Sequence, residues 1–400
     1  MSQRIVISGI GIVSALGLGK NVAFQALREG RTGIAPVQYL QTEHKTFPVG
    51  ELKFTNDEMM DMLGIAKNVP HTRTSLMGML AVKEALENVH IPPKSRTAFV
   101  NGTTVGGMDK TELYYLDFLS NHNKDEYIAI HDCGACSEMI AEHFGDMFSH
   151  VQTISTACSS AANAIMMGAM LIKNRQADVV VAGGSECITK FHLNGFNALM
   201  ILDNEQCKPF DANRHGLNLG EGAAYMVLET EEHFLARNRS SEPLAILSGY
   251  ANTCDAFHQT ASSPDGEGAY RAMKQALEVA HLQATEIDYI NAHGTGTLNN
   301  DSSEAAAISR VFGNAIPHVS STKSFTGHGT SAAGGLEAVI SILSLQNNFM
   351  PASLNFATKP EDIPFSPLVV GQNAPLQHVM SNSFGFGGNN TALIFSKYSK

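Results

Sequence analysis

Short apolar strands alternate with helical segments along the first part of the chain. Runs rich in Val, Ile and Ala contain few charged positions and end at Gly or Asn, a pattern typical of buried strands in α/β proteins. Between residues 74 and 89 the apolar positions recur with the spacing of a helix. The predicted strands are Arg4–Gly9, Thr97–Asn101, Val151–Thr156, Ala177–Ala182 and Tyr225–Glu229. This alternation predicts a layered α/β fold.

The second part of the chain repeats the order of these elements at low sequence identity. A helix predicted from Ser331 takes the place of the helix that follows the third strand. The corresponding strands are Leu244–Gly249, Ile287–Ala292, His318–Ser321 and Thr391–Phe395. We therefore expect a pseudo-duplicated fold with halves 1–245 and 246–400. Equivalent strand ends of the two halves would then meet around one site.

Composition describes a compact chain with a large core. The 400 residues are 44% hydrophobic and 16% charged, and the formal net charge is −11. This charge argues against nucleic acid or an anionic membrane surface as the main partner. No apolar run reaches the roughly 20 residues that cross a bilayer, so we expect no membrane span.

Two motifs in the sequence are only weak evidence for a metal site or a dinucleotide-binding site. Cys133 and Cys136 form a lone CxxC without a second pair to complete a metal site, so we expect no metal. With six scattered cysteines we expect reduced thiols and a cytoplasmic protein. Gly9 and Gly11 resemble half of a dinucleotide fingerprint, but Ser14 stands at the third glycine position. We interpret the pair as a turn between a strand and a helix.

Cys158 lies where the predicted strand Val151–Thr156 gives way to a helix of small residues. Free N–H groups and the positive end of the helix dipole favour a thiolate at such a position. The thiolate is the nucleophilic form of cysteine. A buried cysteine chosen only for its size is the alternative.

Three later loops contain the groups that could act with a thiol at strand ends. Asn291-Ala-His293-Gly-Thr-Gly-Thr297 and Lys323-Ser-Phe-Thr-Gly-His328 each supply an imidazole. Asn382-Ser-Phe-Gly-Phe-Gly-Gly-Asn-Asn390 is a predicted glycine-rich turn. A thiol, two imidazoles and closely approaching backbone are the components of a Cys/His acyl-transfer site.

These four motifs, in order and spacing, resemble the β-ketoacyl–acyl carrier protein synthases of fatty acid and type II polyketide assembly. The resemblance covers nearly the whole chain. It implies a thiolase-type fold, in which two βαβαβαββ halves form five layers, α-β-α-β-α. It also implies a decarboxylative Claisen condensation that extends an acyl chain by two carbons. The product would be a 3-oxoacyl-acyl carrier protein.

The resemblance assigns roles to matching positions. Cys158 would carry the acyl chain as a thioester, and His293 and His328 would bind the malonyl thioester carbonyl and promote decarboxylation. The N–H groups of Cys158 and Phe386 would form the oxyanion hole, with Phe386 also gating the acyl pocket. The helix start would activate Cys158, so neither histidine would need to act as its base. No cofactor is implied beyond the phosphopantetheine of the carrier protein.

Further positions match the family with weaker implications. Lys323 and Glu337 would tune the surroundings of the second histidine, or form an ordinary ion pair. The expected substrate contacts are Thr295, Thr297, Val105 and Asn389. Asp301 and Glu304 also match family positions, but their spacing is that of a helix capping box, which is the interpretation we prefer.

Several departures mark a divergent member of this family. His215, Leu217, Leu298 and Asn389 stand where the family usually has other residues. The polar segment His131–Ser137, which would reach the partner subunit's acyl pocket, predicts a shorter or less saturated chain. Candidates for docking the acidic carrier protein are Lys67, Arg73, Lys208 and Arg214. A secondary-metabolite pathway, such as aryl polyene or polyketide assembly, is an alternative to fatty acid synthesis.

The family leaves alternatives for partner and activity. A homodimer is expected, and the active subunit of a heterodimer with a chain-length-factor homologue is the other possibility. Such inactive partners typically lack the nucleophile, whereas this chain has Cys158 and both histidines. Thiolases need a second cysteine in the C-terminal glycine loop, and residues 382–390 contain none. Priming synthases pair one histidine with an asparagine, so two histidines favour elongation.

Overall fold

The backbone of the fold is a mixed sheet of eleven strands. The structure is a computed structural model that describes residues 4–121, 124–238 and 241–399. Along the sheet the order is β11-β10-β14-β15-β9-β1-β8-β7-β5-β6, with β2 paired to β1. The first set of strands is β1 (Ile5–Ser14), β5 (Thr97–Gly102), β6 (His150–Ile154), β7 (Val179–Glu186) and β8 (Gly222–Thr230). The second set is β9 (Ala245–Cys254), β10 (Tyr289–Asn291), β11 (His318–Ser320), β14 (His378–Gly385) and β15 (Asn389–Ser396).

Each set of five strands has the same internal order, with its third strand at the outer edge and its first strand in the centre. Counted from its outer edge, each set has two parallel pairings followed by two antiparallel ones. β1 and β9 join the sets through the pairs Val6–Ile246 and Ile7–Ala245. The division into halves 1–245 and 246–400 stays a prediction, and the repeated strand order supports it.

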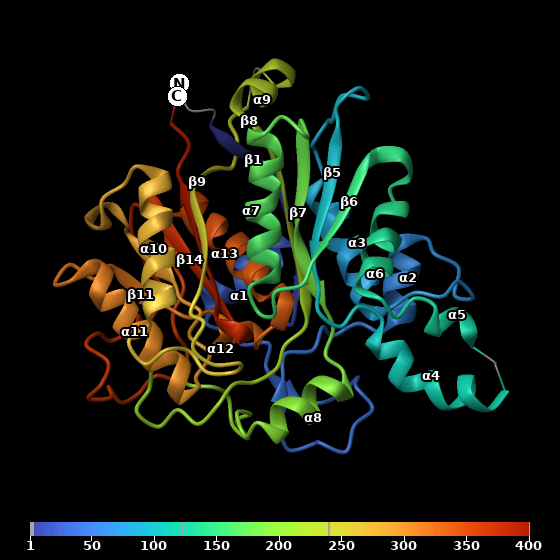
Figure 1. Cartoon of the computed structure of the whole chain (residues 1–400), viewed down its shortest axis with the longest axis horizontal. Helices are drawn as coiled ribbons and strands as arrows, with labels where there is room; N and C mark the ends of the chain where they lie inside the picture. Colours follow the sequence, from blue (N-terminus) through green and yellow to red (C-terminus); the bar gives the residue numbers. More distant parts are fainter. Residues whose placement is uncertain (1–3, 122–123, 239–240, 400) are drawn as a thin grey trace.

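Helices separate and cover the two parts of this sheet in five layers (Figure 1). α7 (Ser160–Lys173) and α13 (Ala333–Asn347) lie between the sheet halves and contact each other. α3 (Arg73–Ala85) covers the outer face of the first half, and α10 (Glu267–Ala280) covers the outer face of the second. α13 is buried on every side from Ala333 to Leu345, as expected for a helix without a polar face.

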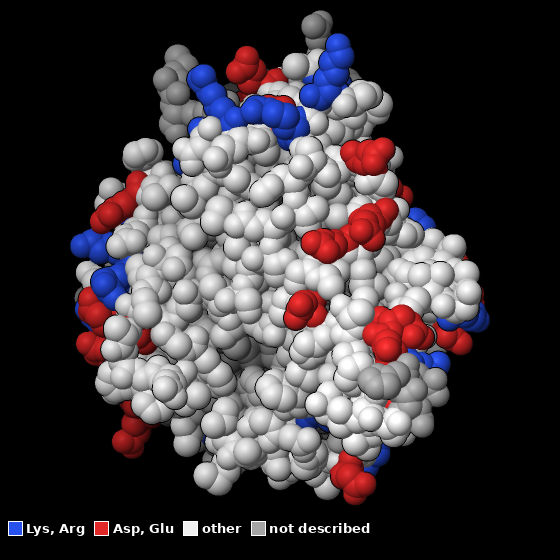
Figure 2. Space-filling model, turned by 45° about the vertical axis from the view of Figure 1, so that its right-hand side comes forward, with Lys and Arg blue, Asp and Glu red and all other residues white. Residues whose placement is uncertain are grey.

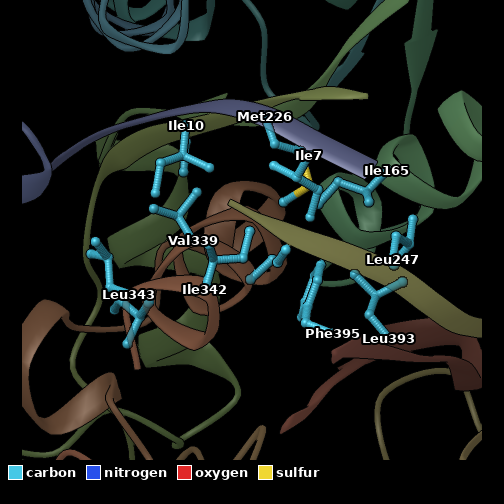
Figure 3. Packing of buried hydrophobic residues seen from close by; sticks show 14 of the residues in the cluster. Ile7, Ile10, Ile165, Met226, Leu247, Val339, Ile342, Leu343, Leu393 and Phe395 are labelled. Atoms are coloured by element: carbon cyan, nitrogen blue, oxygen red, sulfur yellow. The ribbon is translucent and has the colours of Figure 1, made fainter. Parts of the chain in front are cut away.

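The largest hydrophobic cluster fills the space around the central helices. Figure 3 shows Ile7 of β1 and Met226 of β8 facing Ile165 of α7, with Leu393 and Phe395 of β15 nearby. The cluster therefore joins strands of both halves through one core. Cys158 precedes α7 and His328 precedes α13, so this core supports the elements that follow both residues.

The remaining elements are short or peripheral. Among the described residues, no helix is long and apolar enough to cross a membrane. The other helices are α1 (Lys20–Glu29), α2 (Asn56–Leu63), α4 (Met108–Asn121), α5 (Asp125–Ile128), α6 (Cys133–Glu142), α8 (Lys190–Ala198), α9 (Glu231–Arg237), α11 (Leu298–Phe312) and α12 (Lys323–Thr326). The short strands are β2 (Gly17–Leu18), β3 (Ala35–Pro36), β4 (Pro48–Val49), β12 (Phe349–Met350) and β13 (Gln372–Asn373).

The predicted turn at Gly9 and Gly11 is wrong, because β1 continues through both glycines to Ser14. Their role is close packing against α3. A Cβ at Gly9 would lie 2.0 Å from the carbonyl oxygen of Ala85, and one at Gly11 would lie 2.0 Å from that of Ala81. The two glycines thus let a helix approach the strand directly.

We expect Gly11→Ala to destabilise the protein, since its methyl group would meet helix backbone that cannot move alone. Overpacking of this kind typically lowers the free energy of unfolding by about 1–3 kcal/mol. Denaturant unfolding measures the change. The control is Gly195→Ala in α8, where no atom lies within 4 Å of the added Cβ. Equal stability of Gly11→Ala and the wild type would contradict this packing argument.

Candidate active site

Cys158 lies in a sharp turn between β6 and α7. β6 ends at Ile154 and α7 begins at Ser160. Ala157, directly before the cysteine, has φ 51°, which is rare for a residue with a side chain. Such strained backbone concentrates at functional sites. Within the turn, the Ser160 Oγ accepts from the Thr156 N–H at 2.8 Å.

The structure brings the three expected reactive side chains together. His328 Nε2 lies 3.1 Å from Cys158 Sγ. The rings of His293 and His328 meet edge to face with centroids 5.3 Å apart. All three side chains line one cavity of about 260 Å³, together with Phe384 and Phe386.

The surroundings of Cys158 oppose the activation expected from the helix start. Burial raises the pKa of the Cys158 thiol to about 11. The Lys323 charge and hydrogen bonds from the N–H groups of Phe386 and Cys158 lower the pKa, but they do not overcome burial. The prediction that the helix start yields a thiolate is therefore wrong for the free protein. The thiol is protonated at neutral pH and faces His328 Nε2.

Both histidines are neutral. Burial lowers the pKa of His293 and of His328 well below the usual range, and the Lys323 charge adds to this effect. A neutral imidazole carries one proton and can donate it in one hydrogen bond. Among the described residues, the buried Nδ1 of His328 has no partner.

Lys323 contacts the first histidine rather than the second. Its Nζ lies 3.2 Å from His293 Nδ1 and donates to the His293 carbonyl oxygen at 2.5 Å. Because an ammonium group only donates, Nδ1 must accept, and the ring proton resides on Nε2. Lys323 also forms a buried ion pair with Glu337. The predicted role of Lys323 is to tune the surroundings of His328. In the described structure it acts on His328 through its charge alone, and its side-chain hydrogen bonds go to His293 and Glu337.

The predicted capping box at Asp301 and Glu304 is wrong. α11 begins at Leu298 after Thr297, so both carboxylates lie inside the helix and are buried. Glu304 accepts from the backbone N–H of His293 at 2.9 Å and of Gly294 at 2.7 Å. Burial raises the pKa of Glu304 to about 7. These carboxylates hold the histidine loop, a function that the local spacing did not reveal.

The C-terminal glycine segment is partly strand. β14 continues to Gly385, so only Phe386–Gly388 forms the turn that the sequence predicted over a longer segment. A Cβ at Gly385 would lie 3.1 Å from the Cys158 nitrogen. The absence of a side chain therefore lets the turn approach the cysteine. The Phe386 ring stacks on Phe196 with centroids 5.8 Å apart.

The expected substrate contacts divide into two groups. Thr295 and Thr297 line the cavity, and their hydroxyl groups are 2.9 Å apart. Val105 and Asn389 do not line it. The Val105 N–H points to Glu186 at 3.3 Å. A role for Val105 and Asn389 in binding substrate stays a prediction.

Glu186 is a buried carboxylate that the sequence reasoning missed. It accepts from the Thr103 hydroxyl at 2.9 Å, the Thr104 N–H at 2.7 Å and the Ser331 hydroxyl at 2.5 Å. It thereby connects β7, the loop after β5 and the segment before α13. Its only sequence signal is a charged residue at the end of an otherwise apolar strand.

The four basic residues expected to dock a carrier protein are all engaged. Arg73 and Arg214 are largely buried, with side chains 12% and 3% exposed. The ion pairs are Lys67–Asp61 (3.3 Å), Arg73–Glu221 (2.6 Å), Lys208–Glu205 (2.6 Å) and Arg214–Asp362 (3.5 Å). No residue that lines the cavity is Lys, Arg, Asp or Glu. Three of the positions at which the sequence departs from the family pattern line the cavity, namely His215, Leu217 and Leu298.

The CxxC motif makes no disulfide. Cys133 and Cys136 are free, as are the other four cysteines. In the part of the chain that the structure describes, no three His, Cys, Asp or Glu side chains are grouped to hold a metal ion.

Comparison with known proteins gives consistent matches over the whole chain. Residues 2–233 match the family "Beta-ketoacyl synthase, N-terminal domain", and residues 244–357 match "Beta-ketoacyl synthase, C-terminal domain". The chain is 34% identical to 3-oxoacyl-acyl-carrier-protein synthase 1 of Haemophilus influenzae, covering 99% of each. It is 31% identical to synthase 2 of Staphylococcus aureus, again covering 99% of each. The ishigamide ketosynthase/chain length factor structure matches with TM-score 0.92 and 28% identity over 100% of both chains.

The protonated thiol predicts an unusual pH dependence for alkylation of Cys158. Below a pKa of about 11 the thiolate fraction increases about tenfold with each pH unit, so the iodoacetamide rate should still increase above pH 9. Intact-mass analysis with peptide mapping follows the rate at Cys158. Free N-acetylcysteine is the reference, since an ordinary cysteine has a pKa of about 8.5. A rate that levels off below about pH 8 would show an activated thiolate instead.

Proposed function

The chain belongs to the β-ketoacyl synthase family, and from this premise we propose that it extends an acyl chain held on Cys158. The second substrate is malonyl-acyl carrier protein, and decarboxylative Claisen condensation yields 3-oxoacyl-acyl carrier protein, two carbons longer. The observation that carries this proposal is the Cys158 thiol 3.1 Å from His328 in a cavity shared with His293. The relatives, named 3-oxoacyl-acyl-carrier-protein synthases, support the same chemistry.

In the loading step, Cys158 Sγ attacks the thioester carbonyl of the incoming acyl group. Since the thiol is protonated, its proton passes to His328 Nε2, which lies within hydrogen-bond distance. The N–H groups of Cys158 and Phe386 receive the negative charge on the carbonyl oxygen. The carbon–sulfur bond to the carrier thiol then breaks, and that thiol takes the proton from His328.

In the condensing step, both histidines donate to the carbonyl oxygen of the malonyl thioester. His293 presents Nε2–H because Lys323 occupies its Nδ1 side. Once Cys158 is acylated it has no thiol hydrogen to give to His328 Nε2, so this nitrogen can carry the ring proton and donate it to the carbonyl oxygen. Carbon dioxide leaves, the electron pair forms an enolate, and the enolate carbon attacks the acyl-Cys158 carbonyl. The carbon–sulfur bond to Cys158 then breaks, and the released thiolate takes a proton from water. Removing one such donor typically costs about 3 kcal/mol of transition-state stabilisation.

Substrates reach this cavity on the phosphopantetheine arm of the acyl carrier protein. Thr295 and Thr297 line the cavity and offer hydroxyl groups to the amides of such an arm. We propose no other cofactor. Reduced thiols at all six cysteines suit a cytoplasmic enzyme, which is also part of this proposal.

The chain also needs a partner subunit, and we propose a second copy of the same chain. β6 pairs only with β5 among the described strands, which leaves its other edge open. On α4, Leu113, Leu116 and Leu119 are 55%, 79% and 59% exposed. Figure 2 turns the side of α4 forward and shows a broad face with few charged side chains. A chain-length-factor homologue, as in the ishigamide complex, is the alternative occupant.

Substitution of the nucleophile tests the reaction. We expect Cys158→Ala to abolish chain extension, and Cys158→Gln to block acyl loading while malonyl decarboxylation continues. Mass spectrometry of the loaded protein and release of carbon dioxide measure the two steps. Cys254→Ala is the control, because that thiol is exposed and lies outside the cavity. Full condensation by Cys158→Ala would refute the proposal.

Mass in solution tests the partner. We expect the purified chain to be an active homodimer, and Leu116→Lys to shift it towards monomer by placing a charge among the exposed leucines of α4. Light scattering measures the mass in solution, and a condensation assay measures the activity. The control is Leu235→Lys on α9, away from α4. An inactive monomer that gains activity only with a homologous subunit would establish the heterodimer instead.

A further inference from the structure

A cluster of amide and hydroxyl side chains lies behind the active site. We call it the amide cluster; its members are Ser159, Asn163, Asn252, Asn389 and Thr391. Its central atom is Asn389 Oδ1, which accepts from Ser159 Oγ at 2.7 Å, Asn163 Nδ2 at 2.8 Å and Asn252 Nδ2 at 2.7 Å. Asn163 Oδ1 in turn accepts from Thr391 Oγ1 at 2.8 Å and Asn252 Nδ2 at 3.1 Å. The cluster joins α7, β9 and β15.

The amide cluster also holds the turn that presents Cys158. Asn163 Nδ2 donates to Thr156 Oγ1 at 2.9 Å, and the Thr156 carbonyl oxygen, 2.7 Å from Ser159 Oγ, shares the single proton of that hydroxyl with Asn389 Oδ1. Thr156 precedes the strained Ala157 and Cys158. The side chains that fix one oxyanion donor, the Cys158 N–H, are therefore those that contact Asn389.

Asn389 anchors the second oxyanion donor from the other side. It follows Phe386 by three positions, and the two residues between are Gly387 and Gly388, with φ 79° and 76°. On its outer side the bend is held by backbone hydrogen bonds, from the Gly387 N–H to the Gln259 carbonyl oxygen at 2.7 Å and from the Asp255 N–H to the Gly388 carbonyl oxygen at 2.8 Å. The position of the Phe386 N–H relative to Cys158 consequently depends on its anchors, of which Asn389 is the one tied to α7.

We propose that Asn389 is a positioning residue that sets the separation of the two oxyanion donors through its Oδ1. This inference rests on the proposed function and adds a role that the substrate-contact prediction did not contain. Acyl transfer to Cys158 needs both N–H groups at one oxygen. Decarboxylation of the malonyl thioester relies instead on His293 and His328, and in the described part of the chain no hydrogen bond joins the amide cluster to either histidine.

Two near-isosteric variants separate the accepting atom from the shape of the side chain. Asn389→Asp keeps an oxygen for the three donors, and Asn389→Leu removes it. We expect Asn389→Leu to slow acylation of Cys158 by about tenfold to a hundredfold, as a misplacement of about 1 Å can do. Malonyl decarboxylation should stay within about threefold of wild type, and Asn389→Asp should restore most of the acylation rate.

Asn252→Ala is the second variant, since it removes one donor to Asn389, together with the longer contact to Asn163 at 3.1 Å, and does not line the cavity. It should also slow acylation of Cys158, but by less than Asn389→Leu does. Asn347→Ala at the end of α13 is a control for loss of an exposed amide side chain that donates to the Leu343 carbonyl oxygen, and both rates should match those of the wild type. Rapid-quench mass spectrometry with a short acyl pantetheine thioester measures loading, and carbon dioxide release measures decarboxylation.

Two results would overturn the inference. One is equal loading by Asn389→Leu and the wild type; the other is a parallel loss of loading and decarboxylation, which marks a merely structural role. Failure of the proposed function looks different, because the wild type itself would then neither load an acyl group nor release carbon dioxide.

Discussion

A buried ammonium group, Lys323 Nζ, sets the chemistry of the reacting side chains around it. It donates towards His293 Nδ1 and its carbonyl oxygen, and Glu337 balances its charge. Its positive charge helps to keep His293 and His328 neutral, and it lowers the pKa of Cys158 against the effect of burial. Neutral imidazoles can donate to an enolate oxygen without a further base, so burial and this cation together support the proposed mechanism.

The fold brings these groups together by duplication. Two five-stranded sets with the same order pack through α7 and α13, so the strand ends of one half face those of the other. Cys158 comes from the first half, while His293, Lys323 and His328 come from the second. Glycines permit the close approaches, as at Gly385 against the Cys158 nitrogen. A small set of rigid elements therefore determines the geometry of a mostly uncharged cavity.

Buried polar groups, rather than the reactive ones, hold the loops in position. Glu304 secures the His293 loop through two backbone N–H groups, and Glu186 secures the loop after β5. The amide cluster connects the Cys158 turn with the Phe386 turn through Asn389. Burying a polar group costs free energy unless the group forms hydrogen bonds. Each network therefore favours a single arrangement of the loops that it connects. Acylation and decarboxylation can thus depend on separate supports within one cavity.

Local pattern and motif order were enough to predict the α/β class, most strands, the repeat and the reactive trio, since apolar runs and Gly-bounded loops are local signals. Tertiary structure decided the rest. It placed Gly9 and Gly11 inside β1, Asp301 and Glu304 inside α11, and Lys323 against the first histidine rather than the second. It also raised the pKa of Cys158 above that expected at a helix start. Desolvation depends on every atom packed around a group, and no stretch of sequence contains that information.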